Sequence, residues 1–320
     1  MKKFLHRLLF AGLTTVITVF FSEKAFWYVQ GYAYWELILY YAFPVFACLW
    51  LIEYFCVRRL SSLVFVAAFY AFLIEGVLTP VLYEAGILDP FLPAYFVCWH
   101  GLLSIVFGWY LVRKWLVSGM WKRLLLAGFL FGLFWGIWSI TYWLPETYEE
   151  FINPGQWPVI DFALYAFTFT LSLIIGHLML GLGGWPSSFR PTKIEKWVVA
   201  LFLVALFALN IVPVVPPGIL KLGFLLGIIG IFLAINRRRE GQKTLFAELA
   251  GPVTVWHALV LLIIPLTAIS VYGLATVVDP SPETLHILLE DIPLIQALIG
   301  VGFFLWAGLV TLWPKREQQP

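Results

Sequence analysis

The sequence has few charged residues and few cysteines. Only 12% of its 320 residues are charged and 62% are hydrophobic, whereas roughly a quarter of the residues of a soluble domain carry charge. Its three cysteines, Cys48, Cys56 and Cys98, are scattered and form neither a CxxC pair nor a disulfide framework. A soluble core cannot hide this much apolar surface. The composition therefore excludes a soluble globular protein and predicts that lipid is the solvent.

The sequence also lacks the local motifs of common enzymes. It contains no HExxH, no Gly-rich phosphate loop and no Gly-x-Ser-x-Gly elbow. It has no basic, polar segment long enough to form a nucleic-acid module, so no nucleic-acid partner is expected. No local spacing indicates a metal site, and no cofactor can be identified from the residues.

Long apolar runs recur along the whole chain. Crossing about 30 Å of hydrocarbon requires roughly 20 helical residues. Ten windows of that kind predict an all-α, polytopic integral membrane protein with about ten transmembrane helices. They lie near residues 4–21, 35–57, 60–79, 93–112, 122–143, 158–181, 196–214, 218–236, 252–276 and 292–313.

The basic residues lie almost entirely on one side of this predicted topology. With the amino terminus inside, 18 of the 20 Lys and Arg residues are cytoplasmic, and only Lys24 and Lys221 lie outside. This asymmetry follows the positive-inside rule and predicts that both termini are cytoplasmic. The short loops favour the cytoplasmic membrane of a prokaryote.

The two parts of the chain differ in composition. Twelve of the 16 Trp residues lie before residue 190, as do nearly all the intramembrane carboxylates. We therefore expect residues 1–190 to hold any polar site and the Leu-, Ile- and Val-rich residues 191–320 to serve as scaffold, with no soluble domain. Glycines four residues apart predict close helix packing. They are Gly128, Gly132 and Gly136 in one helix and Gly223 and Gly227 in another.

Two ionisable residues are predicted at similar depth in the outer leaflet. Glu75 lies about 22 Å along its helix from the cytoplasmic end, and His100 about 10 Å below the outer start of the next helix. Consecutive antiparallel helices allow them to touch, and Asp161 could join them from above. Pro80 cannot donate to the carbonyl of Gly76, which leaves a backbone acceptor beside the Glu75 carboxylate. Ionisable residues inside a membrane are site candidates by default.

Three interpretations of this group remain open. Glu75 and His100 can form a pair that only fixes helix packing. They can belong to a transport or proton-coupling site, which Asp161 would complete. They can also be the acid and base of an enzyme, or ligands to a metal, although a metal requires three or more ligands.

A second polar layer is predicted near the inner face. Glu53, His177 and His257 each lie roughly 6–8 Å from a cytoplasmic helix end, where a side chain can reach the interface at little cost. These residues are either interface residues without a special role or the inner half of a polar path. The tetrapeptide around His100 recurs around His257 as Trp-His-Ala-Leu, a weak echo of the inverted repeats of transporters.

The leading functional hypothesis is a transporter or permease for a small solute or lipid-like molecule, with its polar site in the outer leaflet. The alternatives are a membrane-embedded enzyme acting on a lipid or isoprenoid, and a non-catalytic subunit of a membrane complex. Membrane lipids are the expected partners, and the sequence leaves open a homo-oligomer or a membrane-complex partner.

Overall fold

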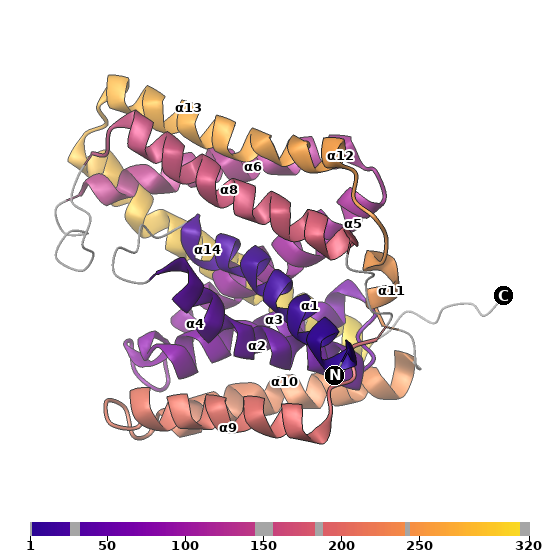
Figure 1. The fold of residues 1–320 in the computed structure, drawn as a ribbon. Coiled ribbons are helices and arrows are strands. Elements are labelled where there is room, and N and C mark those ends of the chain that lie inside the picture. Colours follow the sequence, from indigo (N-terminus) through magenta and orange to yellow (C-terminus); the bar gives the residue numbers. More distant parts are fainter. Residues whose placement is uncertain (1, 26–32, 145–155, 183–187, 241–243, 314–320) are drawn as a thin grey trace.

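The chain folds into a bundle of helices in the computed structural model (Figure 1). The structure describes residues 2–25, 33–144, 156–182, 188–240 and 244–313, and these contain no β-strand. The basic residues Lys243, Lys315 and Arg316 of the predicted cytoplasmic set lie outside the described residues. The predicted all-helical class is confirmed.

Nine helices in the described part of the chain are long and apolar enough to cross a membrane. They are Lys3–Lys24, Tyr34–Tyr54, Leu60–Leu78, Phe91–Val117, Trp121–Trp143, Val159–Leu182, Gly218–Arg237, Val255–Val278 and Pro282–Leu312. The remaining predicted window forms a helix too, α9 (Lys193–Asn210), but its first turn carries Lys193, Glu195 and Lys196. These charges leave α9 less apolar than the other nine.

Several of the helices change type along their length, from α-helical to π-helical or 3-10 hydrogen bonding. The elements follow in the order α1 (Lys2–Val19), η1 (Phe20–Lys24), α2 (Tyr34–Tyr54), α3 (Leu60–Leu73), η2 (Ile74–Leu78), η3 (Val81–Tyr83), α4 (Phe91–Phe96), η4 (Val97–Leu111), α5 (Val112–Val117), α6 (Trp121–Ile140), η5 (Thr141–Trp143), α8 (Val159–Leu182), α9, α10 (Gly218–Glu240), α11 (Phe246–Leu249), α12 (Val255–Leu259), η6 (Val260–Leu262), α13 (Ile263–Val278) and α14 (Pro282–Leu312). The segments η1, η2 and η4 are π-helical.

The helices form three groups in Figure 1. α6, α8 and α13 pack together at the top of the view, and α9 and α10 lie at the bottom. Between them lie α1, α2, α3 and the α4–η4–α5 helix, while α14 packs against α3, α4 and η4. The first residues of α1 lie at the right of the view. The middle group is covered on both sides by the outer helices.

The most buried helices are α3 with η2 and the helix that contains η4. The most apolar stretch of Leu60–Leu78 is 89% buried and that of Phe91–Val117 is 78% buried, against 28% for Gly218–Arg237 of α10. α3 and η4 approach closely because Gly101 has no side chain. A Cβ atom there would lie 2.9 Å from the backbone oxygen of Ala67.

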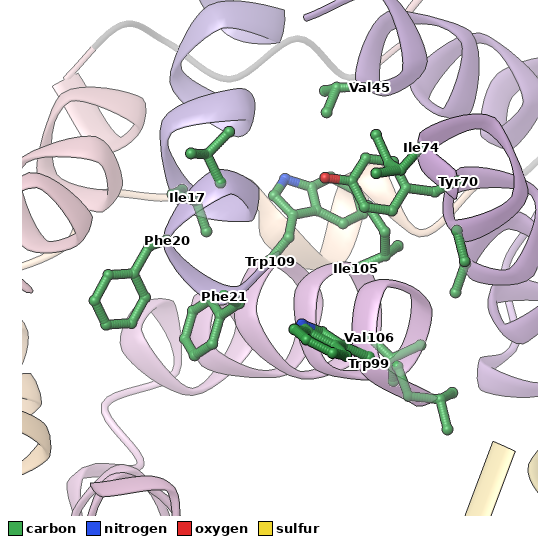
Figure 2. Close-up of a cluster of buried hydrophobic side chains, with 14 of the residues drawn as sticks. Ile17, Phe20, Phe21, Val45, Tyr70, Ile74, Trp99, Ile105, Val106 and Trp109 are labelled. Atoms are coloured by element: carbon green, nitrogen blue, oxygen red, sulfur yellow. The ribbon is translucent and has the colours of Figure 1, made fainter. Parts of the chain in front are cut away.

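Aromatic side chains fill the centre of the bundle (Figure 2). Phe20 and Phe21 of η1 meet edge to face at 4.9 Å, and Trp99 and Trp109 of η4 lie in the same cluster. The ring of Phe21 occupies the space that a side chain at Gly108 would need. The core therefore locks η1 against η4.

The predicted glycine packing is present in one helix and not in the other. Cβ atoms at Gly132 and Gly136 of α6 would lie within 2.9 Å of α13 atoms, so this stripe is a helix interface. At Gly223 and Gly227 of α10 an added Cβ would meet no atom within 4 Å. Those two glycines face open space. The close helix packing predicted for them is therefore absent within a single chain, and that prediction is wrong.

Candidate functional site

The predicted contact between Glu75 and His100 is present. Oε1 of Glu75, in η2, lies 2.5 Å from Nε2 of His100, in η4. The His100 side chain is 2% exposed and the Glu75 side chain 11% exposed. The pair therefore lies inside the bundle, with both side chains largely buried.

The second carboxylate oxygen and the neighbouring backbone are also engaged. Thr79 donates its hydroxyl to Oε2 of Glu75 at 2.8 Å. Tyr83 donates to the carbonyl oxygen of Gly76 at 2.8 Å. Pro80 removes the amide that would pair with this carbonyl in a continuing α-helix, and the Tyr83 hydroxyl takes its place. The backbone acceptor predicted from Pro80 is present, and it is satisfied by a side chain.

The imidazole of His100 is fixed between aromatic rings. It stacks on Trp99 at 5.4 Å between ring centres with an interplanar angle of 10°, and Phe96 lies 6.1 Å away. Trp99 is itself held by a 3.0 Å hydrogen bond from Nε1 to the carbonyl oxygen of Ser22. With Nε2 on Glu75, the buried Nδ1 has no hydrogen-bond partner within the described residues. A buried polar atom without a partner requires an explanation, such as a proton, water or ligand that binds there.

A second carboxylate lies near the pair, and the sequence analysis did not select it. Glu23 of η1 is within electrostatic range of both His100 and Glu75. Tyr41 of α2 donates a short hydrogen bond to its Oε1 atom. Glu23 is partly exposed, although Ser22 and Lys24 on either side are buried. The site therefore has two carboxylates, one on η1 and one on η2.

A line of hydroxyl groups runs from this region into the core. Ser22 contacts Tyr70 at 3.1 Å and Ser104 at 2.7 Å, and all three residues are completely buried. Tyr70 also belongs to the aromatic cluster of Figure 2. Hydroxyl groups both donate and accept, so this line can reorient its hydrogen bonds without moving heavy atoms.

The three π-helical segments are the elements that build this site. η1 supplies Ser22 and Glu23, η2 supplies Glu75, and η4 supplies His100 and Ser104. π-Helical turns are rare and occur frequently at functional sites. We refer to Glu23, Tyr41, Glu75, Thr79 and His100 as the carboxylate–imidazole site.

Asp161 does not join this site. It lies exposed in the first turn of α8. Within the described ranges, no hydrogen bond or ion pair connects it to Glu75 or His100. Nor is any group of three or more His, Cys, Asp or Glu side chains in the described residues arranged to hold a metal ion.

The three residues of the predicted inner layer occupy separate places. Glu53 accepts a 2.7 Å hydrogen bond from Arg190 at the edge of a surface pocket. His177 is fully buried in α8, and its carbonyl oxygen accepts a 2.7 Å hydrogen bond from Arg113. His257 follows the N-cap Thr254 in α12 and lies beside Gly119.

The tetrapeptide echo has no structural counterpart. Trp99 is 3% exposed in the core, whereas Trp256 is 80% exposed. The two matching segments therefore occupy unlike environments and do not indicate a repeated site.

Protein-family models, curated proteins and solved structures were all compared with this chain, and none matches. The function is therefore argued from the geometry of the site alone.

Proposed function

We propose that this protein is a transporter or permease for a small solute or lipid-like molecule, and that the carboxylate–imidazole site carries a coupling proton. In this proposal α9 is the tenth membrane span, and both termini lie in the cytoplasm of a prokaryote, as the distribution of Lys and Arg favours. The observation that carries the proposal is the buried Glu75–His100 pair, in which a carboxylate and an imidazole are hydrogen-bonded inside the bundle.

The charges of the groups around Glu75 support a role in proton binding. The group comprises the carboxylates Glu23 and Glu75, the buried Lys24 and His100. It is neutral when the imidazole carries one extra proton, and it gains one positive charge when a carboxylate is protonated as well. Since a net charge inside a membrane is costly, loading a second proton favours a compensating movement of solute or charge.

The geometry allows the proton to move with little rearrangement. A proton in the hydrogen bond between Oε1 of Glu75 and Nε2 of His100 can pass from one atom to the other. Thr79 holds the other carboxylate oxygen, and the Trp99 ring holds the imidazole plane. A solute that displaces water from this site would change which of the two atoms keeps the proton.

The test uses the purified protein in liposomes that contain a pH-sensitive dye. A panel of amino acids, sugars, nucleosides, polyamines and short fatty acids is added outside. At least one class is expected to drive a proton flux that Glu75→Gln lowers at least tenfold. Asp279→Asn is the control, because Asp279 is exposed at φ 50°, a conformation that Asn tolerates. A flux that Glu75→Gln leaves unchanged, or no flux with any class, overturns the proposal.

One observation favours a second candidate, a membrane-embedded enzyme acting on a lipid. An imidazole whose Nε2 is held by a carboxylate and whose Nδ1 has no hydrogen-bond partner, as in His100, has the arrangement of a general base. This candidate predicts a change in the lipid composition of the liposomes that requires His100 and occurs without any solute gradient. Mass spectrometry of lipids before and after incubation distinguishes it from the transporter.

A further inference from the structure

A pocket of about 360 Å³ opens at the surface between α2, α9 and α10. It contains none of the residues of the carboxylate–imidazole site. Its lining includes Trp50, Glu53, Tyr54, Arg190, Lys196 and Arg237. Its volume is within the range of small-molecule sites, which begins at roughly 300 Å³.

The pocket has an excess of positive charge. Glu53 accepts hydrogen bonds from Nε of Arg190 at 2.7 Å and from the amide of Phe189 at 3.3 Å. The hydrogen bond and charge of Glu53 raise the pKa of Arg190, which therefore remains a cation. Among the described side chains, which exclude those of residues 238–240, no carboxylate pairs with Lys196 or Arg237. These two residues are therefore cations without a described carboxylate partner.

Aromatic rings of α2 position these two cations. Nζ of Lys196 lies 5.0 Å from the ring centre of Trp50, and the guanidinium of Arg237 lies 4.3 Å from that of Tyr54. A contact with an aromatic face leaves the N–H groups available for hydrogen bonds. Arg offers five such donors in a planar fork that matches phosphate, and Lys offers three.

The surroundings of the pocket indicate where its ligand comes from. Next to Lys196, α9 exposes Trp197, Val198 and Leu201, which are 68%, 54% and 62% exposed. A ligand that combines a phosphate with an apolar chain would contact both surfaces. Basic pockets between helices on the cytoplasmic side are typical sites for lipid head groups.

We propose that this pocket binds the phosphate of an anionic phospholipid, with Lys196 and Arg237 contacting the phosphate and the lipid chain lying along α9. The Glu53–Arg190 pair forms one wall and fixes the segment that precedes α9. This site is independent of the proposed transport activity.

Binding to purified protein in detergent tests the proposal, with dioctanoyl phosphatidylglycerol, dioctanoyl phosphatidylcholine and inorganic phosphate as probes. We expect phosphatidylglycerol to bind at least tenfold more tightly than phosphatidylcholine, and Lys196→Gln with Arg237→Gln to weaken that binding at least tenfold. The charge-conserving pair Lys196→Arg and Arg237→Lys should bind within about threefold of the wild type.

The matched control is Lys122→Gln with Arg123→Gln. Lys122 also lies over an aromatic ring, 5.6 Å from Trp121, and both residues are exposed outside the pocket. This pair removes the same charge and should leave binding unchanged. Equal loss in both double variants would show non-specific attraction and overturn the site. Displacement of phosphatidylglycerol by equimolar inorganic phosphate would indicate a soluble phosphate ligand and overturn the lipid assignment.

Discussion

Glu75 and Glu53 are both carboxylates that are hydrogen-bonded to a side-chain nitrogen, but their surroundings differ. The partner of Glu75, His100, is 2% exposed, whereas the partner of Glu53, Arg190, is 79% exposed. Glu75 lies on a π-helical turn between the two most buried helices, and Glu53 lies in the regular helix α2 at the edge of the bundle. Burial strengthens the electrostatic interaction within the Glu75–His100 pair, so the gain or loss of one proton changes its energy strongly. Water screens the charges of the Glu53–Arg190 pair.

The largest expected effect is that of removing the buried carboxylate. Glu75→Ala leaves Nε2 of His100 without a partner inside the bundle, and we expect the free energy of unfolding to fall by about 3 kcal/mol. The midpoint of thermal unfolding in detergent measures this loss. Glu53→Ala, whose partner is exposed to water, should change the midpoint little. Equal effects of the two substitutions would contradict the contrast between the sites.

A smaller effect is expected from adding a methyl group where the central helices touch. Gly101→Ala places Cβ 2.9 Å from the Ala67 oxygen, and such overpacking costs about 1–3 kcal/mol. Gly227→Ala in α10 meets no atom within 4 Å and should stabilise its helix by about 0.5–1 kcal/mol. Denaturant unfolding of the two variants in the same detergent compares the centre with the periphery. A loss at Gly227 would instead indicate an interface of α10 that one chain does not contain.

The smallest effect concerns the backbone beside Glu75. Tyr83→Phe removes the hydroxyl that donates to the Gly76 carbonyl and should cost about 1 kcal/mol. Tyr40→Phe is the control, because Tyr40 is 40% exposed and makes no hydrogen bond within the described residues. Both variants are compared by thermal unfolding. Identical midpoints for the two would mean that water replaces the Tyr83 hydroxyl.

Much of the fold could be predicted because apolar runs between charge clusters define the helices directly. The start of α14 could not be predicted in this way. The last window was predicted near 292–313, but Ser281 caps a helix that begins at Pro282 and continues through Glu290 and Asp291. A strong N-cap followed by Pro at the first helical position was the signal that could have placed this boundary.

The candidate site was predictable only in part. Glu75 and His100 belong to consecutive predicted helices, and helix rise predicts that they lie at comparable depth, so the predicted topology alone brings them together. Glu23 was placed in a turn beyond the first helix, because no sequence pattern revealed that η1 continues the helix for five more residues in π-helical form. Asp161 lies at the expected start of its helix, but its position on the exposed face of α8 depends on packing that hydropathy does not specify.

The 15-residue η4 has a mechanical consequence. Its hydrogen bonds span five residues rather than four, so each of its turns holds more residues than an α-helical turn. Deleting one residue between Phe96 and His100 would rotate the imidazole around the helix axis by somewhat less than the roughly 100° per residue of an α-helix. It would then face away from Glu75, while the residues before the deletion kept their positions. Helix register therefore determines, as much as side-chain conformation does, whether proton donor and acceptor can meet.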